Sequence, residues 1–276
     1  MPPGDTWLHE IKYDGWRLTA RTDHSPVALY TRGGVEWSKR IPAIARALTT
    51  LRVGVSWLDG ELVYLRGDGR PDFAALHDSI NGGDQRGLYY HIWDVPWLDG
   101  NDLTRAPLVE RKERLRELLR NSHPRLRYTD HIVGSGAEVF SAVEAQDLEG
   151  IVSKRCASRY RPGERSRDWR KIKVWRRETV TLGGLEWDAE GRLAALLVGT
   201  PHGRELRYDG RVEFGLGRLN LLGEGLVKLV ADRAPFAGEW KGSHRQWLRP
   251  EVQVEIQALP RRDGETLRHA TLIGPQ

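Results

Sequence analysis

The chain has 276 residues, with 43 lysines and arginines against 38 aspartates and glutamates, and a formal charge of +5. This length is enough for one large domain or two ordinary ones, each with its own core. The single cysteine, Cys156, excludes an intramolecular disulfide framework and an all-cysteine zinc site. The N-terminus is polar, and no stretch reaches the ~18 apolar residues of a membrane span. We therefore expect a cytoplasmic enzyme or binding protein with no membrane contact.

Positive charge is concentrated in one stretch of the chain. Residues 153–177 hold eleven basic residues and two acids, a net charge of +9, so the remainder is slightly acidic. A solvated basic face is the ordinary interpretation of such a run. This run is interleaved with Tyr160, Trp169 and Trp175, however, and it follows an apolar segment that has the pattern of a strand. Basic residues mixed with aromatic ones are typical of contact with nucleic-acid phosphates or nucleotides.

In the first half of the chain, strands alternate with helices. Strands are predicted by apolar–polar alternation, and helices by apolar residues three and four apart. In chain order we expect strands at 7–22 and 27–31, a helix at 42–51, a strand at 56–66, a helix at 72–80, strands at 88–96 and 125–133 with a helix at 108–121 between them, a helix at 136–146 and a strand at 151–154. The clearest amphipathic helix is 108–121, with an apolar stripe at Leu108, Leu115, Leu118 and Leu119.

The second half consists of short alternating runs separated by turns. We expect strands at 178–187, 192–199 and 205–216, a helix at 219–233, and strands near 252–258 and 267–273. Several short strands with one helix favour a small barrel, and the OB-fold leads the possibilities. The sequence thus predicts an α+β protein with one domain at residues 1–175 and a barrel at residues 176–276.

Several short motifs combine lysines with carboxylates. Lys12 precedes Asp14 and Gly15 at the end of a predicted strand, where an amine that loses its proton could act as a nucleophile. Taken alone, this motif fits a surface lysine before a turn better. Glu61 follows Asp59 and Gly60 and could bind a ribose hydroxyl or a metal, although a bulge with exposed acids is the commoner explanation.

Two further motifs lie at the edges of the basic stretch. Glu149 and Lys154 flank an apolar strand, a spacing suited to a metal ligand and a phosphate ligand, or to a buried strand with charged ends. In a strand, Lys171 and Lys173 would share one face and could both reach a triphosphate, although protective lysines on an edge strand show the same pattern. Four of the eight lysines fall in these motifs, whereas arginine supplies most other positive charge.

In order, these motifs resemble those of the covalent nucleotidyltransferase superfamily, which contains ATP-dependent DNA ligases, RNA ligases and mRNA-capping enzymes. The resemblance rests on six motifs, at residues 12–17, 30–34, 59–61, 89–94, 149–154 and 169–173. Residues 97–103, 159–166 and 267–269 are most similar to the ligase domain of bacterial end-joining ligases. The resemblance implies a nucleotidyltransferase domain, with ATP-grasp-like antiparallel sheets and helices, followed by an OB-fold.

The resemblance also implies a mechanism and roles for individual residues. Lys12 would attack the α-phosphate of ATP, and the resulting AMP would pass to the 5′-phosphate of a nick before the 3′-hydroxyl displaces it, with Mg²⁺ (or Mn²⁺) as cofactor. The implied nucleotide contacts are Glu10, Ile11, Arg17, Arg32, Glu61, Trp93, Lys154, Lys171 and Lys173; the metal ligands are Glu61 and Glu149; the supporting residues are Asp14, Gly15 and Arg268; and the DNA contacts are Arg159, Arg161, Arg165 and Arg167.

The sequence departs from the family pattern at two places. Trp93 replaces the usual phenylalanine, which should preserve stacking. The last motif stops soon after Arg268, so adenylation of Lys12 should be slow or should rely on Arg261, Arg262 and Arg268. Because Lys12 lies close to the start, we also expect no N-terminal DNA-binding domain. Such a monomer, associated with the nucleoid, would hold nicked or broken DNA with its two domains or be delivered by a Ku-type end-binding protein.

Two other hypotheses remain open. The chain could be an RNA ligase or guanylyltransferase of the same superfamily, or a non-catalytic nucleic-acid-binding module whose site has decayed.

Overall fold

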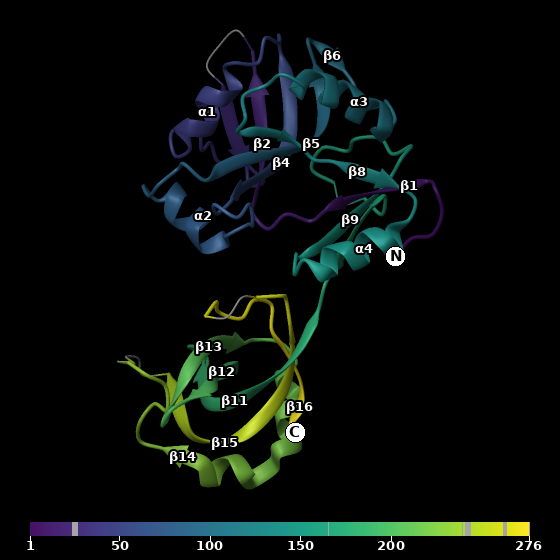
Figure 1. Ribbon diagram of the computed structural model, residues 1–276. Coiled ribbons are helices and arrows are strands. Elements are labelled where there is room, and N and C mark those ends of the chain that lie inside the picture. The colour runs from purple at the N-terminus through teal and green to yellow at the C-terminus, as the bar shows by residue number, and fades with distance from the viewer. Residues whose placement is uncertain (24–26, 165, 239, 241–243, 262–263, 276) are drawn as a thin grey trace. The chain divides into compact units, whose positions relative to one another are not determined.

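The computed structural model of the chain describes residues 1–23, 27–164, 166–238, 240, 244–261 and 264–275. The chain divides into two compact units, residues 1–172 and residues 173–276. Each unit has a buried apolar core of its own, and Figure 1 labels the elements of both. Within the described ranges, no helix is long and apolar enough to cross a membrane.

A six-stranded sheet carries most of the core of the first unit. It contains β2 (Trp16–Thr22), β3 (Ala28–Thr31), β4 (Ser56–Tyr64), β5 (Leu88–Leu98), β6 (Asn101–Asp102) and β7 (Leu126–Tyr128). The strand order is β3-β2-β4-β5-β6, and β7 pairs with β5 off this path. The pairs are antiparallel, as predicted for this domain, except that β5 and β7 run parallel. Leu18, Leu62 and Ile92 are fully buried in the core of this unit.

The second sheet of this unit has four strands in the order β10-β9-β1-β8. They are β1 (Trp7–Ile11), β8 (His131–Val133), β9 (Gly150–Arg155) and β10 (Trp169–Lys173). The alternating run at 7–22, predicted as one strand, is therefore two strands in different sheets, and residues 12–15 cross between them. The run at 125–133 divides in the same way, into β7 and β8. Alternation alone misses such breaks because its period is the same on both sides.

Gly15 holds the crossing segment against β4. A Cβ atom at this position would lie 2.1 Å from the carbonyl oxygen of Leu62, so a larger residue would displace the backbone. The sequence suggests a sharp turn at Asp14 and Gly15, but Gly15 is not among the glycines with positive φ. Position 15 requires glycine because the backbone of β4 lies so close to it, and not because of a turn conformation. As a result, Lys12 is placed where the chain passes from one sheet to the other.

The four helices predicted in this unit are all present, within one to three residues of the expected ends. They are α1 (Pro42–Leu48), α2 (Phe73–Ile80), α3 (Leu108–Leu119) and α4 (Gly136–Ala145). Asp72 caps α2, because its side chain accepts a hydrogen bond from the backbone N–H of Ala75 at 3.0 Å. Helix α3 packs on β5, and α4 packs on β9, as Figure 1 shows.

The second unit is a strongly curved antiparallel sheet, visible as a barrel in Figure 1. Its strands are β11 (Arg176–Trp187), β12 (Leu193–His202), β13 (Glu205–Val212), β14 (Val230–Ala231), β15 (Arg245–Ala258) and β16 (Thr271–Pro275). They run in the order β13-β12-β11-β15-β14, and β16 also pairs with β15. Leu182, Val198 and Ile256 fill the interior and have no exposed surface.

The helix predicted at 219–233 differs from the structure. A 3₁₀ helix, η1 (Leu216–Leu229), occupies this segment and is followed directly by β14. Gly217, Gly223 and Gly225 fall inside it. Glycine disfavours a regular α-helix by about 1 kcal/mol per residue, which explains the irregular form.

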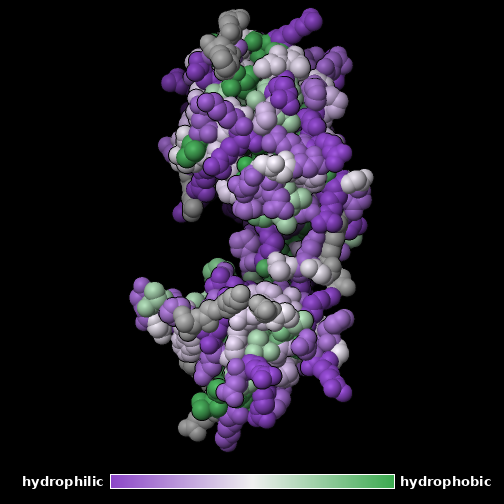
Figure 2. Space-filling view, turned by 90° about the vertical axis from the view of Figure 1, so that its left-hand side faces the viewer, coloured by the Kyte–Doolittle hydropathy of each residue, from purple (hydrophilic) through white to green (hydrophobic). Residues whose placement is uncertain are grey.

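The surface in Figure 2 is mainly hydrophilic, and hydrophobic residues form only small separate patches on the face shown.

Candidate active site

Lys12 forms an ion pair with Glu149 in the first unit. The Lys12 Nζ to Glu149 Oε2 distance is 2.5 Å, and the two side chains are 13% and 8% exposed. The backbone N–H of Lys12 donates to the carbonyl of Gly150 at 2.8 Å. Ile11, at the end of β1, pairs with Ile151 of β9. The pairing of β1 with β9 therefore brings together Lys12 and Glu149, which are 137 positions apart in the sequence.

Glu61 and Lys171 border the same site. Burial raises the pKa of Glu61 to about 7, against the opposing effect of the Lys12 and Lys171 charges. Burial and the neighbouring charge of Lys12 lower the pKa of the Lys171 ammonium, although Glu61 and Glu149 act in the other direction. Glu61 of β4, Lys171 of β10, Lys12 just after β1 and Glu149 just before β9 thus act on one another electrostatically.

Arg17 is fixed on β2 by a buried carboxylate. Its Nε donates to Asp59 Oδ1 at 2.9 Å and its Nη2 donates to Oδ2 at 2.7 Å. The hydroxyl of Tyr160 donates to the same Oδ2 at 3.0 Å. Strand register places Arg17 opposite Glu61. Arg17 is thus held beside Glu61 with its side chain still 41% exposed.

A buried cluster centres on Glu10, which precedes Lys12 by two residues. Lys112 Nζ lies 2.5 Å from Glu10 Oε1, and Lys154 Nζ lies 2.6 Å from Oε2. Burial raises the pKa of Glu10, but the two lysines outweigh burial and the pKa falls below its ordinary value. Burial lowers the pKa of Lys154. Lys112 also donates to the carbonyl of Thr129 at 2.9 Å. Both oxygens of Glu10 are therefore fixed by ammonium groups.

Trp93 is an extra residue in β5. Ile92 pairs with Gly60 and Asp94 pairs with Asp59, so Trp93 forms a bulge in the ladder. Bulges redirect side chains. The Trp93 ring meets the Trp169 ring edge-on at 6.4 Å between centroids, and the Lys154 ammonium lies 4.1 Å from the Trp169 centroid and 5.1 Å from that of Trp93. The bulge thus places a tryptophan next to the Glu10 cluster.

Arg111 of α3 and Asp94 of β5 form an ion pair that supports this region. Both side chains are fully buried, with the Arg111 Nε to Asp94 Oδ1 distance at 2.7 Å and the Nη2 to Oδ2 distance at 2.8 Å. Arg111 Nη1 donates to the carbonyls of Ala106 and Ser158, at 2.6 and 2.9 Å. Because Ser158 precedes Arg159 directly, this pair also anchors the start of the exposed basic segment.

The remaining predicted residues lie at varied places. Arg159, Arg161 and Arg167 are exposed, while Arg165 lies outside the described residues. Arg32 is exposed in the turn after β3. Lys173 ends β10 with its ammonium 5.6 Å from the Trp175 ring.

The C-terminal arginines differ from one another. Arg261 pairs with Glu178 at 2.8 Å and with Asp209 at 3.3 Å and is 11% exposed, so its contacts lie within the second unit. Arg262 lies outside the described residues. Arg268 is partly buried, and its backbone carbonyl accepts from Leu259 at 3.2 Å.

The described residues suit a metal ion held jointly by protein carboxylates and substrate phosphates better than one held by protein ligands alone. Among them, no group of three or more histidines, cysteines, aspartates and glutamates is arranged to hold a metal ion. Glu61 and Glu149 nevertheless both face the cations of this site. Mg²⁺ is usually held by one or two carboxylates together with substrate phosphates and water. The pair of glutamates fits that arrangement.

Family models match both units. Residues 2–173 match the ATP dependent DNA ligase domain, and residues 189–276 match the ATP dependent DNA ligase C terminal region. The chain belongs to the ATP-dependent DNA ligase family. The predicted resemblance is thus confirmed.

Two curated relatives of this ligase family member are longer proteins. It is 36% identical to the multifunctional non-homologous end joining protein LigD of Pseudomonas aeruginosa, over 99% of the chain and 34% of the relative. It is 30% identical to LigD of Mycolicibacterium smegmatis, over 97% of the chain and 36% of the relative. The chain spans about a third of the length of these relatives.

Solved ligase structures agree with the fold. The ligase domain of M. tuberculosis LigD has a TM-score of 0.57 at 28% identity, covering 98% of this chain and 89% of that one. A mycobacterial DNA ligase D complexed with ATP and MES has a TM-score of 0.58 at 29% identity, covering 100% and 93%. The predicted α+β class, a nucleotidyltransferase domain followed by an OB-fold, is confirmed.

Sequence reasoning missed Arg111 and Lys112 as members of the site. The sequence predicts an apolar stripe of four leucines on this helix and places arginine and glutamate on its other faces. Yet positions 108, 111, 112, 115 and 119 follow the three-and-four spacing of one buried face, and all five residues are buried. The position of these two cations on the buried stripe was the pattern that could have revealed them.

Proposed function

We propose that this chain is the ligase part of an ATP-dependent DNA ligase, joining 5′-phosphate and 3′-hydroxyl ends through an AMP carried on Lys12. The observation that carries the proposal is the placement of Lys12, held between two sheets and bonded to Glu149 at 2.5 Å. Glu61 and Lys171 interact electrostatically with it. A nucleophilic amine requires this kind of fixed position beside groups that bind phosphate.

In the proposed reaction, Lys12 forms a phosphoramidate bond to the α-phosphorus of ATP, and the bond to pyrophosphate breaks. Glu149 holds the Lys12 ammonium in the structure, so this contact has to loosen before the neutral amine attacks. Lys171 and Lys173 neutralise charge on the α-phosphate, a role that positioned cations fill in phosphoryl transfer. Arg17 and Arg32 contact phosphate or ribose, and Arg268 assists departure of pyrophosphate.

The adenosine site in this proposal lies between Trp93 and the Glu10 cluster. Trp93 stacks on the adenine, and Glu10 accepts a hydrogen bond from its amino group, aided by Ile11 and Lys154. Glu61 binds the ribose. Asp14 and Gly15 keep the crossing segment, and so Lys12, at the right depth. Support comes from the fixed Glu10 carboxylate and from the bulge that directs Trp93.

Mg²⁺ (or Mn²⁺) would be held by Glu61 and Glu149 together with the phosphates of ATP, and it would supply neutralisation of phosphate charge. Burial raises the pKa of Glu61 to about 7, so this carboxylate is only partly ionised near neutral pH. The ionised form is the one that binds a cation.

The DNA in this proposal is nicked or broken double-stranded DNA, bound in part by the exposed Arg159, Arg161 and Arg167 and by Arg165. The Arg111–Asp94 pair and Tyr160 anchor this segment to the Lys12 site. We further propose that the chain acts as a monomer on the bacterial nucleoid in end joining, with a Ku-type end-binding protein as partner.

One experiment tests the core of the proposal. The purified protein is incubated with ATP labelled at the α-phosphate, and a mass increase of one AMP should map to Lys12. Lys12→Ala should reduce labelling and sealing of nicked DNA by more than ~1,000-fold, as removal of a nucleophile commonly does. Sealing by Lys12→Ala at the wild-type rate would refute the covalent mechanism.

The same assay separates the alternatives. Labelling from GTP but not ATP would indicate a guanylyltransferase, and sealing of nicked RNA but not DNA would indicate an RNA ligase. A protein that binds DNA but neither becomes adenylated nor seals would be a non-catalytic binding module.

A further inference from the structure

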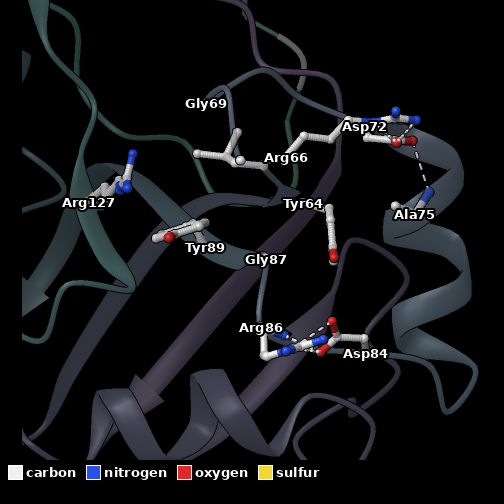
Figure 3. A pocket seen from close by; sticks show the side chains of 12 residues that line it. Tyr64, Arg66, Gly69, Asp72, Ala75, Asp84, Arg86, Gly87, Tyr89 and Arg127 are labelled. Atoms are coloured by element: carbon white, nitrogen blue, oxygen red, sulfur yellow. Dashed lines mark hydrogen bonds and ion pairs between the residues drawn. The ribbon is translucent and has the colours of Figure 1, made fainter.

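A hollow in the first unit is lined by aromatic and arginine side chains that lie outside the Lys12 site. Its volume is about 810 Å³, and it lies where β4 ends and β5 begins, next to α2 and β7. Figure 3 shows Tyr64, Tyr89 and Arg127 around it, with Arg66 and Arg86 at its margins.

The three arginines of this hollow differ in whether a carboxylate pairs with them. Arg66 forms an ion pair with Asp72, and Arg86 forms one with Asp84 at 2.9 Å. The guanidinium of Arg127 instead lies 4.0 Å from the centroid of the Tyr89 ring. In the part of the chain that the structure describes, no carboxylate pairs with Arg127. Its side chain is exposed in the middle of β7, so its positive charge is available to a ligand.

The hollow continues the sheet face that carries the Lys12 site. Tyr89 and His91 lie on one face of β5, whereas Tyr90 and Ile92 lie on the opposite face and pack into the core. His91 pairs with Glu61 on one side and with Arg127 on the other. The His91 ring contacts the ring of Tyr13, the residue after Lys12, at 4.0 Å between centroids. Burial lowers the pKa of His91 to about 3, so this contact is between uncharged rings.

We propose that this hollow binds the phosphodiester backbone of the DNA strand that runs through the Lys12 site. Arg127 donates hydrogen bonds to a backbone phosphate, and Tyr89 supports the guanidinium plane from below. A planar, pre-oriented guanidinium is well suited to phosphate. The inference rests on the proposed ligase function, and it adds a DNA contact outside the basic stretch at 153–177.

The test uses the full chain and a labelled nicked duplex whose 3′ end lacks its hydroxyl, so that binding is measured without sealing. Arg127→Ala should weaken binding several-fold and lower the slope of log affinity against log salt by about 0.9, the value for one phosphate contact. The matched control is Arg114→Ala, which removes an arginine that is 52% exposed on α3 and should leave both quantities unchanged.

Tyr89 provides a second pair of variants. Tyr89→Phe keeps the ring and should bind as the wild type does, whereas Tyr89→Leu should lose part of the affinity that Arg127→Ala loses. All four variants should accept AMP from ATP at the wild-type rate, because adenylation involves no DNA.

Equal binding and equal salt slopes for Arg127→Ala and Arg114→Ala would overturn the inference. So would a loss of adenylation in Arg127→Ala, since Arg127 would then act in the nucleotide site. A wild-type protein that fails to become adenylated would instead remove the proposed function, which keeps the two failures distinct.

Discussion

The two units differ in how deeply their least exposed ion pairs are buried. In the first unit, Lys12, Lys112 and Lys154 pair with glutamates, and all of these side chains are nearly or fully buried. Among the described residues of the second unit, the pair of Arg261 with Asp209 is the least exposed, at 11% and 1%. The pair of Arg249 with Glu251 leaves more than half of each side chain exposed. Buried charges are costly to desolvate, while surface pairs contribute little. The comparison indicates that the buried pairs are maintained for what they position.

The largest expected effect comes from breaking the buried pair of Arg111 and Asp94. Arg111→Met should lower the free energy of unfolding by about 3–5 kcal/mol, because it leaves the Asp94 carboxylate buried without a partner. Urea denaturation measures this change. Adding Asp94→Asn to the same variant should restore part of the loss, and a double variant that is no more stable than Arg111→Met would contradict the explanation.

Removing one of the two lysines on Glu10 should have a smaller effect. Lys112→Met leaves Glu10 paired with Lys154 and should cost roughly 1–3 kcal/mol. It should also raise KM for ATP in self-adenylation more than it lowers kcat. The Glu10 carboxylate would stay in the site, because Lys154 still pairs with it, but it would be less well oriented toward the nucleotide. Lys112→Arg should recover much of the KM. An unchanged KM in Lys112→Met would show that the lysine serves stability alone.

The raised pKa of Glu61 predicts a pH effect on stability. The pKa is about 7 in the folded protein and about 4.5 when unfolded, so between these values the folded state keeps a proton that the unfolded state has lost. Stability should therefore fall by about 1 kcal/mol as pH rises from 4.5 to 7, after allowance for partial solvation. Thermal unfolding of Glu61→Gln at the same pH values should lack this component, and parallel curves for the two proteins would refute it.

The smallest effect is expected at the surface of the second unit. Arg249→Ala should change the free energy of unfolding by less than about 0.5 kcal/mol, because an exposed ion pair gains little in water. A loss comparable to that of Arg111→Met would break the contrast between the units.

Much of the fold follows from the sequence because local patterns act over short distances. The helix at 42–48 begins with Pro42 at its first position, and α2 begins after the capping residue Asp72, so both starts are encoded locally. The six motifs in chain order from Lys12 to Lys173 also predict the family, and the family models confirm this prediction.

What the sequence could not reveal depends on contacts between distant residues. The division of residues 7–22 between two sheets depends on pairing with β4 and β9, and nothing within the run marks it except Gly15. The Glu10 cluster joins residues 102 positions apart. The roles assigned to Arg32, Lys173 and Arg268 remain predictions.

The extra residue at Trp93 has a consequence for the tolerance of this chain to insertions and deletions. Without one residue between Gly87 and the bulge, Tyr89 and His91 would turn toward the core and Tyr90 would turn out. The turn between Arg66 and Arg70, by contrast, is exposed, and a side chain added at Gly67 or Gly69 would meet nothing within 4 Å. In a library of single-residue deletions, few functional variants should therefore carry a deletion in β5, whereas many should carry one in this turn.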